Sequence, residues 1–435
     1  MKEAVYEMSY YRSNVKANLT AWVVWGLAAT FFFSDYLARV APSVMHEHIQ
    51  REFGLNELQI GVLNAAFYIP YILMQIPVGL SVDRLSIRNI LTVMSLLTAL
   101  GCVIFGLSDG LMTASFGRML IGFSAAFAFV CALRLATSWF PPVMFGLLAG
   151  LTQALGMLGA AAGDAPVSFL VSHVGWRHTM IIIAFLFIIL AAFLYQYIRD
   201  NPGQKRSVPK KVSDISILMS LKIVLSNRQT WINALYAGFL FGPTAVIGEN
   251  LGPAFLQFGR EFSAHSAAFA TSLIFIGWGI SGPLCGWVSD RLGLRKPLMI
   301  FSAICGIIFS FLIIFLPHMN LNTTMLLFFI FGATNTGVAI SYAVATELHH
   351  PKVVGTSIAF TNMTSIFVGA SLQPIVGQFL HFIGGERSFN VSALDLSDFQ
   401  SAFIILPICS TVALILAFFV KETYCSPVYD QEQEK

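Results

Sequence analysis

The chain has 435 residues, of which 56% are hydrophobic and only 11% are charged. Soluble domains carry about 25% charged residues, so this composition excludes a soluble globular protein. The net charge of +3 is small and gives no reason to expect a nucleic-acid partner.

Apolar segments long enough to cross a bilayer recur along the whole chain. A helix needs about 20 predominantly apolar residues to span the hydrocarbon core. By this criterion we predict twelve spanning helices, at residues 20–42, 57–80, 89–108, 112–137, 145–169, 178–198, 230–255, 264–286, 297–316, 323–346, 353–378 and 399–420. The predicted fold class is therefore an all-α membrane protein.

Lysine and arginine residues are unequally divided between the two sides of the predicted membrane. Eighteen of the 25 lie on the side of the N-terminus, four lie on the opposite side and three lie within spans. Loops rich in these residues stay in the cytoplasm. We therefore expect a multi-pass membrane protein with both termini in the cytoplasm. The N-terminus does not have the pattern of a signal peptide, and the six cysteines show no disulfide or metal-binding spacing.

A basic, proline-containing segment interrupts the apolar pattern near the middle of the chain. We interpret residues 199–228 as a linker between helical bundles at 1–198 and 229–420, with a tail at 421–435. Four matches between the bundles share an offset of 209 residues: Glu52-Phe53 with Glu261-Phe262, Pro142 with Pro351, Gly146 with Gly355, and Thr152 with Thr361. Repetition at one offset indicates duplicated halves, and halves of this kind can rock around a central site to give alternating access.

Ionised side chains inside a membrane span are costly, so each is a functional candidate unless a structural partner explains it. Six lie in predicted spans, namely Asp35, Arg39, Arg118, Arg134, Asp164 and Glu249. Five of the six belong to the N-terminal half, whereas charges that only hold a duplicated scaffold tend to occur in both copies. This asymmetry favours a role in transport.

Asp35 and Arg118 are candidates for proton coupling. Asp35 and Arg39 are four residues apart on one helix face, so one interpretation is an ion pair within the helix. The other interpretation is that Asp35 exchanges protons and that Arg118, which keeps its charge, responds to the change.

Asp164 and Glu249 complete the proton-coupling candidates. Asp164 either takes part in proton movement or pairs with a nearby arginine. Glu249 is flanked by Gly248 and by Gly252-Pro253, residues that can open a helix towards a cavity. The alternative position for Glu249 is the outer water boundary.

Arg39 and Arg134 are candidates for binding a substrate carboxylate or phosphate, because a guanidinium presents a planar fork to such groups. Arg134 lies near the end of its helix, where snorkelling is the alternative explanation. The further candidate substrate contacts are Asn250, Asn335, Tyr342 and Asn362. Each of them can equally form an interhelical hydrogen bond. We expect no metal and no cofactor.

Two loops carry a Gly-xxx-Asp-Arg pattern between the second and third predicted helices of each half, at Gly79–Arg88 and Gly286–Lys296. They resemble the signature loop of the major facilitator superfamily, although the first loop has Ser86 where glycine is usual. Arg118 and Gly122 are similar to that superfamily's Arg-xxx-Gly motif. The resemblance covers essentially the whole chain and implies two pseudo-symmetric six-helix bundles.

A narrower resemblance lies in the first helix. The segment Phe33–Met45 resembles the phagosomal nutrient transporters of intracellular bacteria, and Gly252-Pro253 is partly similar to a pattern of that branch, with Leu251 in place of its tryptophan. This resemblance implies uptake of amino acids or nucleosides across the bacterial inner membrane.

The two signature loops are expected to form a cytoplasmic latch that breaks and re-forms as the halves rock. Its predicted members are Gly79, Asp83, Arg84, Arg88, Gly286, Asp290, Arg291 and Arg295. We expect Asp83 and Asp290 to lie near helix N-termini of their own half, where the helix dipole favours an anion. A static topological anchor is the alternative.

The predicted function is proton-coupled uptake of a small polar nutrient by alternating access, with an amino acid or a related zwitterionic or anionic metabolite as substrate. The alternative is an exporter or exchanger of a siderophore, drug or nucleoside. No phosphate-binding loop, catalytic triad or cofactor motif indicates an enzyme. The expected partners are the substrate, protons and the lipid bilayer, and we expect a monomer.

Overall fold

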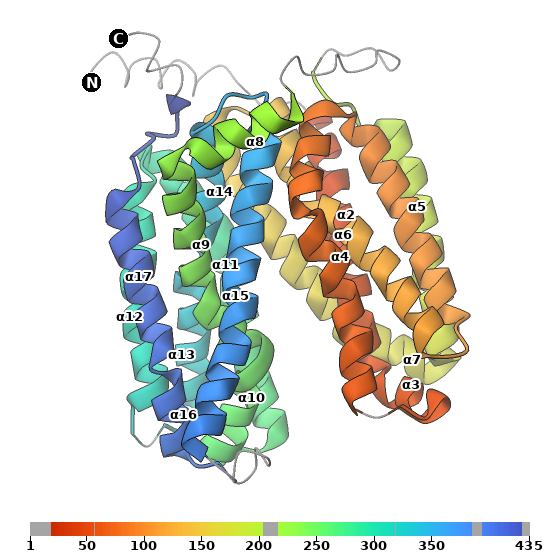
Figure 1. The fold of residues 1–435 in the computed structure, drawn as a ribbon, viewed down its shortest axis with the longest axis vertical. Helices are drawn as coiled ribbons and strands as arrows, with labels where there is room; N and C mark the ends of the chain where they lie inside the picture. The colour runs from red at the N-terminus through yellow and green to blue at the C-terminus, as the bar shows by residue number, and fades with distance from the viewer. Residues whose placement is uncertain (1–18, 56, 203–215, 318, 385–393, 429–435) are drawn as a thin grey trace.

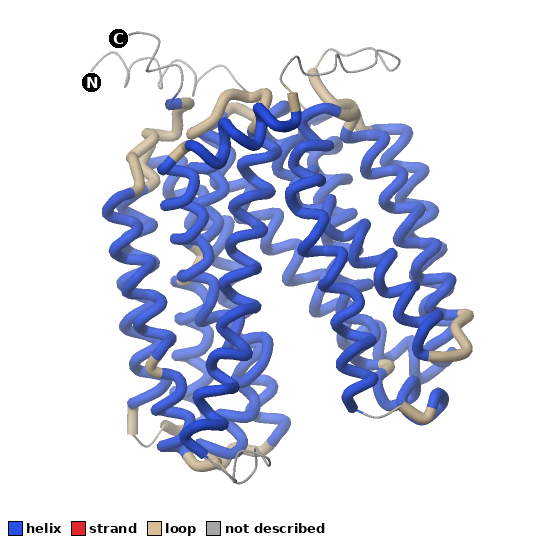
Figure 2. The backbone as a smooth tube through the Cα atoms, viewed as in Figure 1, coloured by secondary structure: helices blue, strands red, loops and turns tan. Residues whose placement is uncertain are grey.

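The computed structural model describes residues 19–55, 57–202, 216–317, 319–384 and 394–428. Regular structure in this part of the chain is helical throughout, without strands (Figure 2). Twelve helices within it are long and apolar enough to cross a membrane. This confirms the predicted all-α membrane fold, and the twelve spans agree with the predicted ranges to within a few residues at most of their ends.

The N-terminal half contributes six of these spans. Its elements are α2 (Leu19–Val44), α3 (His46–Phe53), α4 (Glu57–Arg84), α5 (Ile87–Gly106), α6 (Leu111–Trp139), η1 (Pro142–Met144) and α7 (Phe145–Tyr197). Element α7 holds two spans, because Gly175 has a φ of +80° and breaks the helical path there. A positive φ is readily adopted only by glycine.

The C-terminal half contributes the other six spans, after the short helix α8 (Ile217–Ser226). Its further elements are α9 (Arg228–Val246), η2 (Ile247–Leu251), α10 (Gly252–Ala254), η3 (Phe255–Gly259), α11 (Ala264–Leu292), α12 (Lys296–Phe315), α13 (Leu321–Thr334), α14 (Gly337–Glu347), α15 (Val354–Gly384), α16 (Leu396–Phe403) and α17 (Ile405–Phe419). Elements α13 and α14 together form one span, as do α16 and α17.

The two halves stand side by side and converge at the end of the bundle where α8 lies (Figure 1). We call this end the linker end, and the opposite end, where α3, α10 and α16 lie, the open end. The halves touch mainly through two helix pairs, α4 with α15 and α7 with α11. The two pairs are related by the duplication, because α4 corresponds to α11 and α7 corresponds to α15.

Glycines allow the α7–α11 pair to approach at backbone distance. A Cβ atom added to Gly150 would lie 2.2 Å from the carbonyl oxygen of Gly282, and one added to Gly286 would lie 2.0 Å from that of Gly146. No side chain fits such a space, so these four glycines set the separation of the two helices. Small residues are the common solution where membrane helices pack closely.

Carboxylates that follow the last helix of each half fasten the third helix of the same half. Asp200 accepts hydrogen bonds from the main-chain nitrogens of Ile87 and Arg88 at 2.7 and 3.2 Å. Glu422 accepts from the main-chain nitrogens of Arg295 and Lys296 at 2.9 and 2.8 Å. An anion at a helix N-terminus satisfies free N–H groups and complements the helix dipole. At the linker end, each half therefore has the residues after its last helix bonded to its own third helix.

Candidate functional site

A cavity of about 290 Å³ lies between the two halves. Its walls come from α2, α4, α6 and α7 of the N-terminal half and from α9, η2, α11, α14 and α15 of the C-terminal half. The lining side chains include nine aromatic residues, Phe32, Tyr36, Tyr68, Tyr71, Phe129, Phe241, Phe275, Trp278 and Tyr342. A concave, largely apolar site with few polar groups, placed between two bundles, is typical of a small-molecule site.

Arg39 is the one cation among the described residues that line this cavity. Its Nη2 donates to the hydroxyl of Tyr68 at 3.2 Å. The guanidinium carbon lies 5.1, 5.7 and 5.0 Å from the ring centroids of Tyr36, Phe67 and Tyr68. Cation–π contacts of this kind hold a guanidinium in place without neutralising its charge. The arrangement leaves Arg39 able to bind an anionic group in the cavity.

Glu249 is the one carboxylate among the described lining residues, and it comes from the C-terminal half. It lies in η2, a π-helical segment, and its side chain is exposed to the cavity. Nε2 of Gln373 lies 3.5 Å from Glu249 Oε2 and 3.4 Å from the carbonyl oxygen of Ala245. A π-helical turn rotates the residues that follow it and is frequent at functional sites.

A polar bridge connects the halves on the linker side of the cavity. Tyr342 donates to Asn362 Oδ1 at 2.9 Å, and Asn362 Nδ2 donates to Gln75 Oε1 at 2.9 Å. The rings of Phe129 and Tyr342 also meet edge to face across the same interface, with centroids 4.8 Å apart. Two of the predicted substrate contacts, Tyr342 and Asn362, therefore line the cavity and also bond to each other and to the opposite half.

Asp35 and Arg118 lie behind the cavity wall. Asp35 is 2% exposed, and its Oδ1 has no hydrogen-bond partner among the described residues. Arg118 is 3% exposed, donates to the carbonyl oxygen of Arg39 at 3.1 Å and lies 5.1 Å from the ring of Phe67. Within the described chain, no ion pair of 4.0 Å or less joins Asp35 to Arg39 or Arg118. The intrahelical pair that the spacing allows is not formed in this conformation.

Three further predicted site residues are Asn335, Asp164 and Asn250. Asn335 is fully buried inside the C-terminal half, where its Nδ2 lies 3.5 Å from the hydroxyl of Thr244. It is not among the lining residues, which fits an interhelical contact. The side chains of Asp164 in α7 and Asn250 in η2 lie outside the described residues.

At the linker end, Asp83 of α4 caps a helix of the other half. Its Oδ1 accepts from the main-chain nitrogen of Gly355 at 2.8 Å, and its Oδ2 accepts from the main-chain nitrogen and the hydroxyl of Thr356 at 2.9 and 2.8 Å. Both partners lie in the first turn of α15. A carboxylate placed there satisfies the free N–H groups of the helix and interacts favourably with its dipole.

Asp290 of α11 makes the reciprocal contact with the first turn of α7. It accepts from the main-chain nitrogens of Gly146 and Leu147 at 3.3 and 2.9 Å. The prediction that each aspartate lies at a helix N-terminus of its own half is therefore wrong for Asp83 and Asp290. The physical reason is that α4 packs against α15 and α11 packs against α7, so the nearest free helix start belongs to the opposite half.

Arg134 belongs to this linker-end contact and not to the cavity. Its Nε lies 3.5 Å from Asp83 Oδ1, and its Nη2 donates to the carbonyl oxygen of Pro351 at 3.2 Å. Nη1 donates to Thr137 and Ser138 of its own helix, both at 3.0 Å. The side chain therefore spans the two halves beside Asp83, away from the position expected of a substrate ligand.

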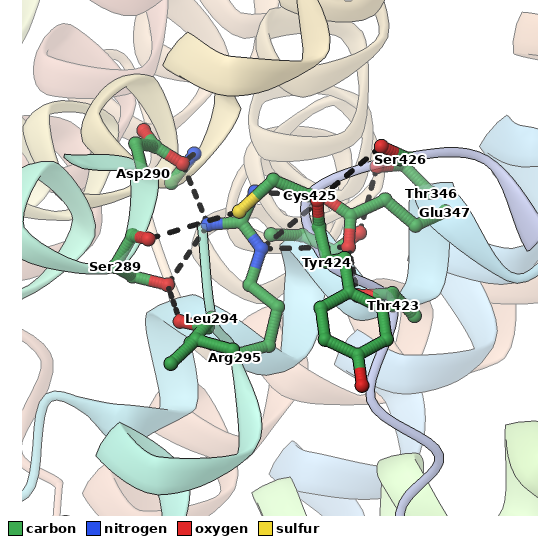
Figure 3. Close-up of polar contacts among 12 residues, drawn as sticks. Ser289, Asp290, Leu294, Arg295, Thr346, Glu347, Thr423, Tyr424, Cys425 and Ser426 are labelled. Atoms are coloured by element: carbon green, nitrogen blue, oxygen red, sulfur yellow. Dashed lines mark hydrogen bonds and ion pairs between the residues drawn. The ribbon is translucent and has the colours of Figure 1, made fainter. Parts of the chain in front are cut away.

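The second aspartate has a different cation. Arg295 is fully buried and pairs with Asp290 at 2.6 Å and with Glu347 at 2.7 Å (Figure 3). Burial acts to lower the pKa of Arg295, but the Glu347 and Asp290 carboxylates outweigh it and raise that pKa. Arg295 therefore stays charged and holds two carboxylates from α11 and α14.

The segment after α17 folds over this ion-pair cluster (Figure 3). The hydroxyl of Thr423 donates to Glu347, and the thiol of Cys425 lies 3.7 Å from the carbonyl oxygen of Ser289. Cys425 is 2% exposed, and its burial raises the pKa of the thiol to about 12. The Thr423 and Cys425 contacts make the first residues after the last helix part of the linker-end structure.

The other predicted latch residues lie around these contacts. Arg84 donates to the hydroxyl of Ser220 in α8 at 3.1 Å. Arg88 lies over the ring of Tyr195 at 5.1 Å, and Arg291 lies over that of Trp287 at 5.1 Å. Gly79 begins the first signature loop as Gly286 begins the second. It allows the same close approach, because a Cβ atom added to Gly79 would lie 2.7 Å from the Cα atom of Thr356 in the opposite half. The signature loops therefore contact the opposite half through their aspartates and glycines, whereas these arginines contact their own half or α8.

The predictions do not include the lining residues Gln153, Trp278 and Gln373, nor Gln75, which bonds to the lining residue Asn362. A signal existed for two of them. Gln153 is the counterpart of Asn362 at the 209-residue offset, and Gln373 is the counterpart of Asp164. A polar residue that recurs at matching positions in both halves is a candidate for the wall of a central site.

Comparison with known proteins identifies the superfamily and related transporters. The family model described as Major Facilitator Superfamily matches residues 27–372 and 244–433. The Probable sulfoacetate transporter SauU of Cupriavidus necator is 24% identical over 384 residues, covering 83% of this chain and 87% of the relative. The Probable galactarate/D-glucarate transporter GudP of Escherichia coli is 22% identical over 407 residues, covering 86% and 89%.

The fold is also similar to that of a solved transporter. The crystal structure of the E. coli fucose:proton symporter FucP (N162A) superposes with a TM-score of 0.71 at 16% identity, covering 92% of this chain and 99% of that one. Neither relative nor this structure is named as a phagosomal nutrient transporter, so that narrower resemblance stays a prediction. The matched segments, the twelve spans and the paired halves agree, and the chain belongs to the Major Facilitator Superfamily.

Proposed function

We propose that this transporter carries a small organic anion by alternating access, with Arg39 as the residue that binds the anionic group. The observation that carries the proposal is the position of Arg39, which faces the cavity between the halves with aromatic rings and the Tyr68 hydroxyl around it. A charged group with no carboxylate partner in a membrane interior is retained for function.

The names of the two relatives support an organic anion as substrate. Sulfoacetate, galactarate and D-glucarate are all organic anions with two acidic groups, and none of them is an amino acid. We therefore replace the amino acid expected from the sequence with a carboxylate, sulfonate or phosphate compound that fits a cavity of about 290 Å³. Arg39 suits a substrate of this kind, because a planar guanidinium binds a carboxylate, sulfonate or phosphate group through two parallel hydrogen bonds.

Proton coupling is assigned to Asp35. This carboxyl is buried behind Arg39 and has an oxygen without a partner among the described residues. A buried carboxylate that lacks a partner is relieved of its desolvation cost when it binds a proton. The solved symporter of similar fold is named as coupled to protons. The net charge around Arg39 and Arg118 depends on whether Asp35 is protonated. The attraction of the site for an anion therefore depends on the same proton.

Uptake across the bacterial inner membrane, with the linker end in the cytoplasm, completes the proposal. The excess of lysine and arginine on the side of the linker supports this orientation. In this orientation the conformation described here is closed towards the cytoplasm, where both aspartate caps are formed.

The experiment is a ligand screen on the purified full-length protein, followed by uptake in proteoliposomes. The probes are sulfoacetate, D-gluconate and D-glucarate, with D-glucose as the neutral control. We expect an anionic probe to raise the melting temperature and to accumulate against its gradient when the outside is acidic. Arg39→Gln should abolish both effects and Arg39→Lys should weaken them. Equal binding of D-glucose, or unchanged anion binding by Arg39→Gln, would overturn the proposal.

A further inference from the structure

The cavity carries one charge of each sign, and the two charges come from opposite halves. Among the described lining residues, Arg39 on α2 is the only cation and Glu249 on η2 is the only carboxylate. At the 209-residue offset, Arg39 corresponds to Gly248, so the two charged residues occupy neighbouring positions on equivalent helices. No ion pair of 4.0 Å or less joins them in the described structure.

Glu249 lines the cavity with an exposed side chain that lies next to a neutral polar group. Its neighbour Gly248 lies close to the ring of Phe275, since a Cβ atom added to this glycine would be only 3.0 Å from the ring. Gln373 Nε2 lies 3.5 Å from one carboxylate oxygen. The Glu249 side chain itself is exposed, and among the described residues no cation lies within ion-pair distance of it.

Trp278 adds a second unused polar group to the same wall. It lines the cavity, it is 4% exposed, and its Nε1–H has no hydrogen-bond partner among the described residues. A buried donor without a partner is costly unless a ligand supplies the acceptor. The C-terminal half therefore lines the cavity with two residues of unsatisfied or exposed polarity, Trp278 with its buried donor and Glu249 with its exposed carboxylate.

We propose that Glu249 makes the cavity selective for monoanions whose far end carries a hydroxyl group, a hydrogen-bond donor, and against dianions. The proposal rests on the function proposed above, because it places the first anionic group on Arg39. It also separates this chain from the two relatives, whose named substrates each carry two anionic groups. A second carboxylate at the far end would then face Glu249, and juxtaposed like charges oppose binding strongly. A probe compound with an ammonium group there, which is a zwitterion, would gain the attraction of Glu249 and of the aromatic rings that line the cavity.

The test uses three six-carbon acids that differ only at the far carbon: D-glucarate, D-gluconate and 6-amino-6-deoxy-D-gluconate. Their affinities for the purified full-length protein are measured by calorimetric titration at neutral pH. We expect the ammonium compound to bind best and the dicarboxylate worst, with a ratio of at least about tenfold between them. Glu249→Gln keeps the size of the side chain and should reduce this ratio to about threefold or less, while Glu249→Asp keeps the charge and should preserve the order.

The outcomes separate this inference from the proposed function. If Arg39→Gln abolishes binding of all three acids but Glu249→Gln leaves their order unchanged, the role of Glu249 is refuted and that of Arg39 stands. Equal or tighter binding of D-glucarate by the wild type also refutes selectivity against dianions. If Arg39→Gln binds all three acids as the wild type does, the proposed function fails, and failure of all three to bind the wild type counts against both.

Discussion

Asp83 accepts a hydrogen bond from the main-chain nitrogen of Gly355 at 2.8 Å, across 272 residues of sequence and across the interface between the two halves. Its counterpart Asp290 makes the corresponding contact with Gly146 and Leu147. Each half thus supplies the cap for a helix of the other. The two caps and the glycine contacts beside them hold the linker end closed.

Asp83→Asn should shift the protein towards the conformation that is open at the linker end. The amide keeps its size but loses a charge that accepts three hydrogen bonds, and hydrogen bonds to charged groups contribute about 1.5–3 kcal/mol each. Spin-label distances between the linker ends of α4 and α15 report the shift. Glu52→Gln, at the open end, is the control and should leave the distances unchanged; an unshifted distribution in Asp83→Asn contradicts the role of the cap.

Gly150→Ala should lower the melting temperature and separate α7 from α11. The new methyl group would lie 2.2 Å from the carbonyl oxygen of Gly282, and overpacking of this kind costs about 1–3 kcal/mol. Gly26→Ala is the matched control, since a Cβ atom at this helical glycine meets nothing within 4 Å. We expect the control to melt at the same temperature or slightly higher, so equal losses in both variants would contradict the packing argument.

Asp35→Asn should abolish transport against a gradient while substrate exchange remains measurable. The neutral side chain mimics the protonated acid permanently, so the binding site still forms but no proton is taken up or released. Uptake into proteoliposomes with and without a pH gradient measures coupling, and counterflow measures exchange. Concentrative uptake by the variant at the wild-type rate would show that the proton binds elsewhere.

Glu347→Gln should destabilise the linker end more than any single change in the segment after α17. Arg295 is fully buried between Glu347 and Asp290, and breaking a buried ion pair costs about 3–5 kcal/mol. Glu422→Gln removes a helix cap, for which we expect a smaller loss of about 1 kcal/mol. Thermal unfolding in detergent compares the two variants, and the opposite ranking would contradict the cluster's role.

His349 should make stability depend on pH in the acid range. Its imidazole bonds to Thr230 at 2.7 Å, and burial lowers its pKa from 6.5 to about 4. Below pH 6.5 the His349 imidazole binds a proton in the unfolded chain but stays neutral in the folded chain. The stability of the folded state therefore falls as the pH drops from 6.5 to about 4. His349→Gln should flatten the melting temperature over this interval.

The control for the histidine prediction is the neighbouring residue. His350 is exposed, and His350→Gln leaves the buried imidazole in place. The slope of melting temperature against pH should therefore stay as in the wild type. If the slope persists in His349→Gln but disappears in His350→Gln, the pH dependence comes from His350 and the prediction for His349 is contradicted.

The helices and their duplication could be predicted from the sequence because bilayer thickness fixes the length of an apolar segment. The offset that relates Gly146 to Gly355 was also recognisable, and both glycines lie at equivalent helix starts in the structure. Arg39, which lines the cavity, could be singled out from the sequence because a charge inside a membrane is costly. None of these inferences needs knowledge of how the halves dock.

What could not be predicted depends on the docking of the halves. Asp83 and Asp290 were assigned to helices of their own half, since sequence distance gives no measure of an interface between duplicated units. Arg134 was expected in the substrate site, but it lies beside Asp83. The exposure of Glu249 to the cavity depends on a π-helical turn, whose single extra residue leaves no reliable pattern in the sequence.

The exchange of caps between the halves is an isologous contact, in which one surface supplies both members of a reciprocal pair. Such a contact does not require two different sequences, because two copies of one six-helix unit related by a twofold axis would make it as well. Gene fusion of two such units would preserve the contacts at the linker end without any new residue. The sequences of the two halves can then differ at the cavity without loss of this contact. Arg39 and Glu249 are such differences, because neither has a charged counterpart in the opposite repeat.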